Sequence, residues 1–307
     1  MAGKVPSDLA RGYLYAVLGA LCGGSVPTLS KILLADNGPG VVAGLPVLLS
    51  GLIFLLYQPK RRPQAGSLKY LLFFGVVGAA LAPLMFVIGL DQTTAVNASL
   101  LANGEVLFTT VIAFSIFGER LSRGQAARGL LIVVGLVSVS TNLDLANVAF
   151  LQGLAGNLLI LGATVCWSVE NNLLALATKR FDASMLSKFR NLIGGGAVMA
   201  VALVVALPLR LSSSDTVVFP LLALAIAGAT YLFIAAVKRL GAIRMLLVWS
   251  TSTVFGAVFA LTFLGEQITL PQLLGGALIL SGVYLFRRGE KVPDAEPFSP
   301  PAEVIAR

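Results

Sequence analysis

The sequence predicts an all-α integral membrane protein with ten transmembrane helices, arranged as two inverted five-helix repeats. Three observations support this fold class. The chain of 307 residues is 57% hydrophobic and only 12% charged, whereas a soluble domain carries about 25% charged residues. Apolar runs of about 20 residues, each long enough to cross a bilayer as a helix, recur along nearly the whole chain. The two halves of the sequence also resemble each other.

Ten apolar runs are separated by short connections that contain turn-forming residues, such as ADNGPG at 35–40. We expect the spans, numbered in chain order, at roughly 12–34, 40–58, 68–90, 94–117, 125–141, 153–178, 184–209, 217–239, 242–264 and 270–287. They divide the chain into a first repeat at 1–148, a second repeat at 149–289 and a proline-rich tail at 290–307. The tail is expected to be disordered and cytoplasmic.

Basic residues flank alternate loops, while the other loops carry mainly acidic residues. The basic flanks contain Lys4 and Arg11 before span 1, Lys60, Arg61, Arg62 and Lys69 after span 2, Arg120, Arg123 and Arg128 after span 4, Lys179 and Arg180 after span 6, Lys238 and Arg239 after span 8, and Arg287, Arg288 and Lys291 after span 10. The positive-inside rule then predicts a multi-pass protein of the plasma membrane (the inner membrane of a bacterium) with both termini cytoplasmic. This asymmetry accounts for the formal charge of +8, and no nucleic-acid partner is expected.

An internal repeat relates the two halves. Residues 95–135 match residues 242–282 at a constant offset of 147 residues. Identical pairs at this offset include Ala95 and Ala242, Phe108 and Phe255, Glu119 and Glu266, and Gly135 and Gly282. Because each half has an odd number of spans, the second half enters the membrane in the opposite orientation. Inverted repeats are typical of secondary transporters, whose substrate site lies near the midplane between the halves.

The motifs FGERLS at 117–122 and LGEQIT at 264–269, each after the fourth span of its half, resemble those of EamA-type transporters of the drug/metabolite transporter superfamily. The similarity covers about residues 10–288. It implies a central cavity lined mainly by spans 1, 3, 4, 6, 8 and 9, with alternating access and export, as in YddG-like ten-span exporters of amino acids. One branch carries an acidic residue and two asparagines in span 6 and a basic residue early in span 7, where this chain has Glu170-Asn171-Asn172 and Arg190.

Glu170 and Arg190 are expected to form an ion pair inside the membrane. Glu170 lies eight residues before the end of span 6 and Arg190 six residues into span 7. At 1.5 Å per residue, both are about 9–12 Å from the cytoplasmic side. Two interpretations stay open: the pair fastens two helices together, or it contacts substrate, since ionisable groups within membranes are functional candidates by default.

Other polar residues of span 6 surround this pair. Trp167, Glu170, Asn171 and Leu174 share one face by helical spacing. An aromatic ring beside an amide and a carboxylate suits a small zwitterion, and we take Trp167, Asn171 and Asn172 as substrate-binding candidates. The alternative for Trp167 is core packing.

Glu105 lies about 16 Å into span 4, near the midplane. A lone carboxylate at that depth could carry a proton, which makes protons the candidate coupling ion; the alternative is a hydrogen-bonded structural acid. Asn103 points the other way and is expected to pair with Ser99. In the second half, Trp249 and Ser252 belong to a polar belt at 249–253 in span 9, and both are substrate-binding candidates because the belt faces Glu105 under the pseudo-symmetry. The alternative is that the hydroxyls of the belt bond their own helix or a neighbouring one.

Further polar and proline residues receive structural roles. We interpret Glu119 and Glu266 as helix caps or loop organisers. Lys31, near the outer end of span 1, is expected to extend toward the membrane interface. Pro27, Pro46 and Pro83 interrupt spans 1 to 3, and proline leaves backbone carbonyls free to shape a cavity.

The predicted function is export of a small polar metabolite, with amino acids or related compounds as the favoured class. The alternatives are an uncoupled facilitator and an integral membrane enzyme. The chain has no histidine and no nucleophile or metal-ligand pattern, so neither catalysis nor a metal or other cofactor is expected. The expected partners are the small-molecule substrate, protons and the lipid bilayer, with the chain a monomer or a weak homo-oligomer.

Overall fold

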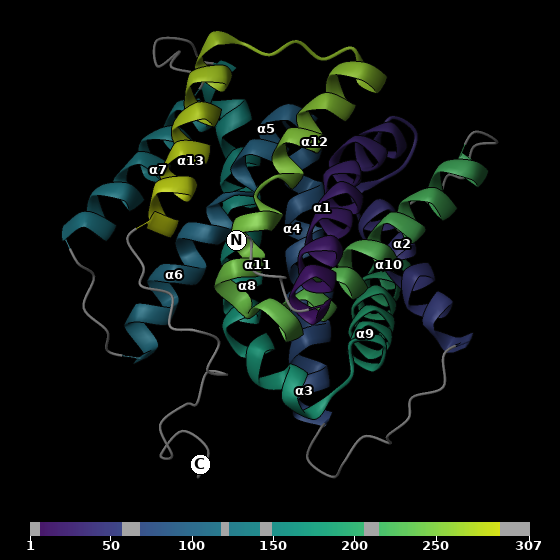
Figure 1. Cartoon of the computed structure of the whole chain (residues 1–307). Helices are drawn as coiled ribbons and strands as arrows, with labels where there is room; N and C mark the ends of the chain where they lie inside the picture. The colour runs from purple at the N-terminus through teal and green to yellow at the C-terminus, as the bar shows by residue number, and fades with distance from the viewer. Residues whose placement is uncertain (1–6, 57–67, 118–122, 142–148, 206–214, 289–307) are drawn as a thin grey trace.

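A computed structural model describes residues 7–56, 68–117, 123–141, 149–205 and 215–288. These residues form helices joined by short turns, and no β-strand lies among them (Figure 1). The predicted tail at 290–307 and Glu119 fall outside the described residues.

The helices follow one another along the chain in the order expected for ten spans. Their bounds are α1 Ser7–Leu34, α2 Pro39–Ile53 with the 3-10 turn η1 Phe54–Leu56, α3 Leu68–Phe73, the π-helix η2 Phe74–Leu81, α4 Ala82–Asp91, α5 Ala95–Leu101, α6 Gly104–Phe117, α7 Arg123–Thr141, α8 Ala149–Arg180, α9 Ala183–Val204, α10 Asp215–Leu240, α11 Ala242–Trp249, α12 Ser252–Phe259, the π-helix η3 Ala260–Leu264 and α13 Leu270–Arg288.

The ten predicted spans correspond to ten helical rods. Span 2 consists of α2 and the short η1 turn, and three others are also built from more than one element. Span 3 consists of α3, η2 and α4, span 4 of α5 and α6, and span 9 of α11, α12 and η3. Within the described ranges, seven rods are long and apolar enough to cross a membrane, and α7 and α13 contain shorter apolar helices. The remaining helix, α9, carries Lys188 and Arg190 and packs along α2.

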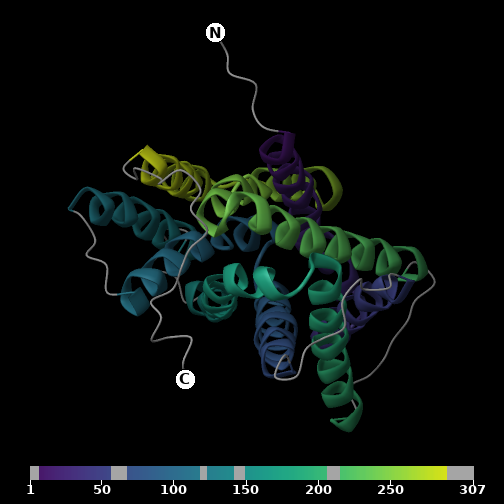
Figure 2. The same cartoon turned by 60° about the horizontal axis from the view of Figure 1, so that its bottom comes forward.

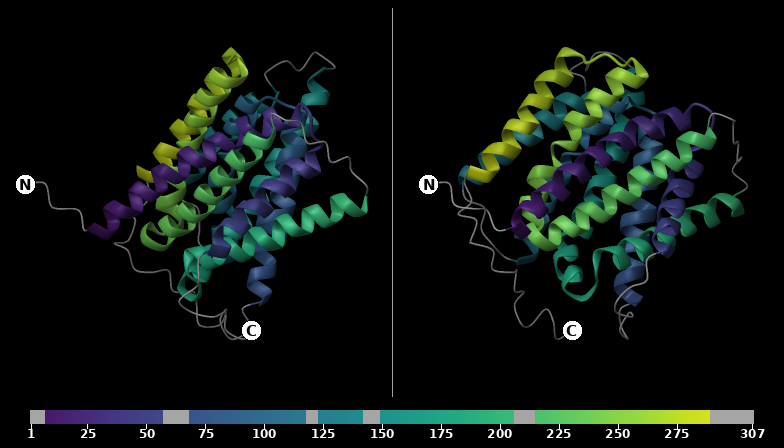
Figure 3. Two further views of the ribbon diagram at one scale, coloured as in Figure 1. Left: turned by 90° about the vertical axis from the view of Figure 1, so that its right-hand side faces the viewer. Right: turned by 45° about the vertical axis from the view of Figure 1, so that its right-hand side comes forward.

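The contacts between rods follow the repeat: when two spans pack together, their counterparts in the other half also pack together. α2 packs on α9 and α7 on α13, so each of these spans meets its own counterpart; Figure 2 shows α7 and α13 at one edge of the bundle and α2 with α9 toward the other. α1 runs along α10 (Figure 3), as α8 runs along α4. α1 also packs on α12, as α8 does on α6. These matched pairs confirm the repeat predicted from the sequence.

Spans 4 and 9 are interrupted at equivalent places. Span 4 breaks at 102–103 and span 9 at 250–251, within one residue of the positions that the 147-residue offset of the repeat relates. Neither break contains proline; both contain residues whose side chains compete for backbone hydrogen bonds. Asn103 Nδ2 donates to Thr253 Oγ1 at 2.6 Å, and that hydroxyl donates to the carbonyl of Ser99 at 2.9 Å. Asn103 therefore reaches Ser99 through span 9, whereas a direct pair was predicted.

Helix α5 is capped at its N-terminus by a residue from the other half. Glu266 accepts hydrogen bonds from the backbone N–H groups of Ala95 and Val96 at 2.7 and 2.8 Å. Gly265, at φ +64°, turns the chain just before it. Carboxylates are favourable at helix N-termini, where N–H groups lack partners. The prediction of a capping role is confirmed for Glu266.

Lys31 fastens α1 to the end of α4. Its ammonium donates to the carbonyls of Leu90, Asp91 and Thr93 at 2.8, 3.2 and 2.8 Å. The last turn of a helix leaves carbonyls without partners, and the Lys31 ammonium donates to them here. The sequence did not predict these acceptors, and the reach of Lys31 toward the membrane interface stays a prediction.

Candidate functional site

A cavity of about 200 Å³ lies between the two halves. Its wall is mostly apolar. The polar side chains in it are Ser30, Ser99, Glu105, Glu170, Asn171, Arg190, Thr230 and Ser252, and the aromatic ones are Phe86, Trp167, Phe233 and Trp249. Besides spans 1, 3, 4, 6, 8 and 9, which the family resemblance implied, α2 and α9 contribute to the lining.

Seven of the eight predicted site residues line this cavity: Glu105, Trp167, Glu170, Asn171, Arg190, Trp249 and Ser252. Asn172 does not. Its amide donates to the carbonyls of Thr109 and Ser168 at 3.1 and 2.8 Å and so fastens α8 to α6. Successive helical residues point about 100° apart, which is why Asn171 faces the cavity while Asn172 faces a neighbouring helix. The prediction that Asn172 lies in the site was wrong.

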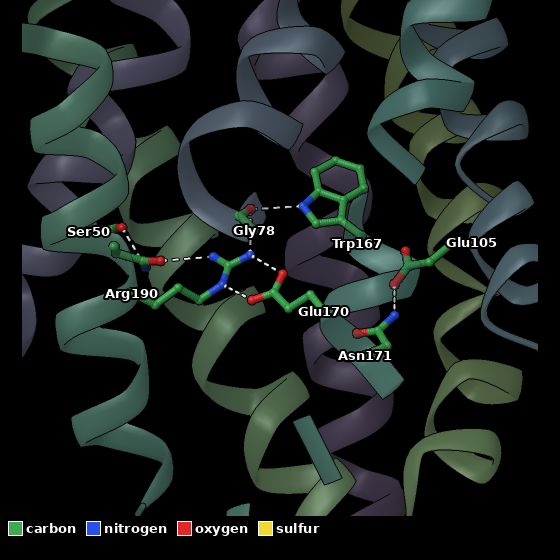
Figure 4. Close-up of polar contacts among 8 residues, drawn as sticks. Ser50, Gly78, Glu105, Trp167, Glu170, Asn171 and Arg190 are labelled. Carbon is green, nitrogen blue, oxygen red and sulfur yellow. Dashed lines mark hydrogen bonds and ion pairs between the residues drawn. The ribbon is translucent and has the colours of Figure 1, made fainter. Parts of the chain in front are cut away.

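Glu170 and Arg190 form the predicted ion pair with two-point geometry. Arg190 Nε lies 2.5 Å from Glu170 Oε1, and Nη2 lies 3.0 Å from Oε2. Two of the three remaining guanidinium hydrogens find further acceptors: Nη1 donates to Asn191 Oδ1 at 3.0 Å, and Nη2 donates to the carbonyl of Gly78 at 2.8 Å (Figure 4). A buried pair is stable only when its other lone pairs and protons are also satisfied, and this pair largely meets that condition on the arginine side.

The carbonyl of Gly78 is free because of Pro83. In an α-helix this carbonyl would accept from Ala82, but the Ala82 N–H donates to Val77 in the π-helical turn. The next possible donor, five residues on, is Pro83, which has no N–H. Gly78 consequently accepts from Trp167 Nε1 at 3.0 Å as well as from Arg190 (Figure 4). Sequence analysis assigned Pro83 to cavity shaping but did not identify Gly78.

Gly78 also gives the carboxylate room. A Cβ atom at this position would collide with the Glu170 side chain, so only glycine lets η2 approach the ion pair so closely. The network continues to α2, because Asn191 donates from Nδ2 to Ser50 Oγ at 2.9 Å. The ion pair thus joins four helical segments, η2, α8, α9 and α2, on one side of the cavity.

Glu105 lies on the other side of the cavity, in the first turn of α6. The residue is 6% exposed, and its carboxylate accepts a hydrogen bond from Asn171 (Figure 4). Ser168 donates to the Glu105 backbone carbonyl at 3.1 Å. No basic side chain of the described chain makes an ion pair with Glu105, so it contributes a carboxylate whose charge is not directly neutralised.

Two tryptophans form opposite parts of the wall. Trp167 packs against Phe86 with ring centroids 5.6 Å apart, and Trp249 meets Phe233 edge-to-face at 4.9 Å. Gly23 leaves space for the ring of Trp249, since a Cβ there would meet its carbon atoms. The break in span 9 lies between Trp249 and Ser252, which places both in the cavity.

The charged lining consists of two carboxylates, Glu105 and Glu170, and one guanidinium, Arg190. Because Arg190 and Glu170 bind each other, Glu105 is the lining carboxyl group without an ion-pair partner among the described residues, and the aromatic rings provide apolar surface. Such a site can hold a small ammonium compound by a charge-assisted hydrogen bond and cation–π contact. Among the described residues, no group of three or more metal-ligating side chains gathers.

The EamA-like transporter family model matches residues 10–141 and again 154–288, once in each half. An uncharacterized transporter of Methanothermobacter thermautotrophicus is 27% identical over 89% of this chain and 85% of its own length. A probable amino-acid metabolite efflux pump of Salmonella typhimurium is 27% identical over 78% of this chain and 85% of its own length. A crystal structure that is 15% identical has the same fold, with a TM-score of 0.64 over 91% of this chain and 98% of that chain. The chain belongs to the EamA-like transporter family.

Proposed function

We propose that this protein is a secondary transporter that exports a small polar metabolite, an amino acid or a related compound, by alternating access through the central cavity. The observation that carries the proposal is the cavity between two related halves, with the carboxylate of Glu105 in its wall. Secondary transporters with inverted repeats bind their substrates at such a place.

The size and lining of the cavity favour a small amphipathic solute. Pockets for drug-sized ligands measure about 300–1,000 Å³, and this one measures about 200 Å³. Glu105 and Asn171 offer polar partners, and Trp167 and Trp249 offer aromatic surface. The printed name of the Salmonella typhimurium relative, a probable amino-acid metabolite efflux pump, favours the same class. The proposed substrate-binding residues are Glu105, Trp167, Glu170, Asn171, Arg190, Trp249 and Ser252.

The proposal includes the plasma membrane, the inner membrane in a bacterium, as location and a cytoplasmic position for both termini. It rests on the basic residues at alternate loops. Protons are the proposed coupling ion, because Glu105 is a buried carboxylate that faces the cavity without an ion-pair partner among the described residues. The alternative is an uncoupled facilitator, which the hydrogen bond from Asn171 to Glu105 favours, since that bond could give Glu105 a purely structural role.

Counterflow in liposomes tests the proposal. Vesicles with the purified protein are loaded with one unlabelled amino acid or amine at a time, and uptake of the labelled compound is followed. We expect at least one compound to exchange faster than in protein-free vesicles. Ser252→Leu should abolish this exchange by filling the cavity, whereas Val254→Leu, on the exposed face of the same helix, should not. Equal exchange by both variants would reject the central cavity as the route.

A further inference from the structure

A second cavity, separate from the central one, lies at one end of α11. It measures about 250 Å³ and shares no lining residue with the central cavity. Its lining residues come from α11, the break that follows it, α1 and α13. Both α1 and α13 pack on α11, and Figure 1 shows the three helices. We call this cavity the α11 groove; its main lining residues are Tyr13, Arg244, Leu247, Thr251, Val283 and Tyr284.

The α11 groove is charged at one end and apolar further in. Arg244 and Leu247 share one face of α11 by their spacing, and Thr251 lies in the break just after this helix. Arg244 is the third residue of the helix, and Thr251 lies about 10 Å further along the axis at 1.5 Å per residue. The lining from α13 follows the same polar-to-apolar order, because Tyr284 lies nearer the end of the groove that holds Arg244 and Val283 lies further in. A cation followed by about 10 Å of mainly apolar surface matches the headgroup and upper acyl chain of a phospholipid.

Arg244 differs from Arg190 and Arg239 in its surroundings. It is partly buried, but none of the hydrogen bonds or ion pairs in the described part of the chain involves it. By contrast, Arg190 binds Glu170, and Arg239 lies beside Asp8 and over the ring of Tyr15. Placing a guanidinium in a groove without a counter-charge costs free energy, so an anion from outside the described chain is the expected partner.

The position of the groove along the chain places it at the level of lipid headgroups. Arg244 lies in the first turn of α11, the helix that follows the basic end of α10 at Lys238 and Arg239. The positive-inside rule assigns this side of the membrane to the cytoplasm. Tyr13 and Tyr284 are 37% and 53% exposed, and tyrosine is enriched at this depth because its ring is apolar and its hydroxyl polar. The groove is thus open to the inner leaflet, where anionic lipids are available.

We propose that the α11 groove is a binding site for one anionic phospholipid of the inner leaflet, with the lipid phosphate on Arg244 and the upper acyl chain along Leu247 and Val283. Basic pockets between transmembrane helices bind anionic headgroups in this way. The site adjoins the break in span 9: Thr251 faces the groove, while Trp249 and Ser252 on either side of the break face the central cavity. The bound lipid contacts the same helix break that shapes the transport site.

Native mass spectrometry of the full-length protein in detergent tests the site. After delipidation, the protein is titrated with phosphatidylglycerol, with phosphatidylcholine of the same chains, and with glycerol phosphate. We expect one phosphatidylglycerol to bind more tightly than phosphatidylcholine, and glycerol phosphate to compete weakly. Arg244→Gln should weaken phosphatidylglycerol binding about fivefold, the share of one basic residue in attraction to an anionic lipid. Arg244→Lys should retain most of the binding.

Two further variants separate the groove from general charge effects. Lys238→Gln removes one exposed positive charge at the end of α10 and should leave binding unchanged. Leu247→Trp fills the groove while keeping Arg244, and should release the lipid. Equal binding of phosphatidylglycerol by the wild type and Arg244→Gln would overturn the proposal. So would equal binding of the two lipids, or full competition by glycerol phosphate, which would indicate a site for a free anion.

Discussion

Arg190 donates a hydrogen bond to the backbone carbonyl of Gly78 at 2.8 Å, across the interface between α9 and the π-helical turn of span 3. That contact makes Arg190 more than the counter-ion of Glu170. The guanidinium makes four hydrogen bonds, to Glu170 (two), Asn191 and Gly78, so most of its donor capacity is used by the protein itself. A role in fastening helices is therefore built into the pair, whatever contact it makes with substrate.

Replacing one member of the pair should be far more damaging than replacing both. Glu170→Gln or Arg190→Gln alone leaves an unpaired buried charge, which costs about 3–5 kcal/mol. The double variant removes both charges and should recover much of the loss. Thermal unfolding of the purified variants in detergent measures the effect. If the double variant is no more stable than the single ones, the two side chains are not coupled.

Transport by the double variant distinguishes the two roles of the pair. Activity that returns together with stability would assign the pair to helix fastening alone. A stable but inactive double variant would assign it to substrate binding or to opening of the cavity. Initial rates per folded protein, in the counterflow assay described above, provide the comparison.

Pro83→Ala should disturb the site through the backbone of span 3, although Pro83 itself lines the cavity. The new N–H at residue 83 can donate to Gly78, which competes with Trp167 and Arg190 for that carbonyl. In a Trp249→Phe background, Trp167 is the sole tryptophan, and its emission should shift to shorter wavelength when its indole N–H loses the carbonyl. Pro220→Ala, at an exposed position of α10, is the control and should leave the emission unchanged. An unaltered spectrum in Pro83→Ala would refute the assigned role of Pro83.

Glu105→Gln should flatten the pH dependence of transport. Gln cannot exchange a proton but can still pair with Asn171, so the fold should be retained. The groups that face Glu105 are Asn171 and the neutralised pair of Glu170 and Arg190. Initial rates between pH 5.5 and 8.5 measure the effect, with Asp36→Asn in an exposed loop as the control. A wild-type pH profile at normal rates would leave Glu105 with a structural role only.

Glu266→Ala should loosen the start of α5. The substitution removes the acceptor for two backbone N–H groups, those of Ala95 and Val96, and loss of a helix cap costs about 1 kcal/mol. Hydrogen exchange of a peptide covering 95–101 should therefore become about fivefold faster. Exchange in α9, which Glu266 does not contact, is the internal control. Equal protection in both proteins would show that the cap contributes nothing.

Cysteine labelling should reveal the orientation of span 3. In a variant with Cys22 and Cys166 replaced by serine, Gln92→Cys should react with an impermeant thiol reagent in intact cells. Lys69→Cys, exposed at the other end of the same span, should react only after permeabilisation. The reverse pattern would place both termini outside the cell.

The sequence predicts features that depend on hydrophobicity, charge and repetition. The spans, the cap by Glu266 and the ion pair of Glu170 with Arg190 all follow from such signals. Side-chain depth alone was enough to pair Glu170 with Arg190, because few charges lie within the spans.

Features that depend on backbone acceptors could not be predicted in the same way. The carbonyl of Gly78 has no signature of its own; it is available only because Pro83 and a π-helical turn divert its usual partners. The same reason explains why the acceptors of Lys31, which include the last carbonyls of α4, were not predicted. Asn172 shows a third limit, since adjacent asparagines share a sequence motif but point to different neighbours.

The contact of Asn103 with Thr253 joins spans 4 and 9 where each is interrupted. This contact is a common pivot for the two short helices that end at the breaks, α5 and α11. They have seven and eight residues, so each is about 10–12 Å long, and a 10° rotation about the pivot moves the far end by about 2 Å. Loss of the contact between Asn103 and Thr253 should therefore change the movement of both helices together, whereas loss of the Glu266 cap acts on α5 alone.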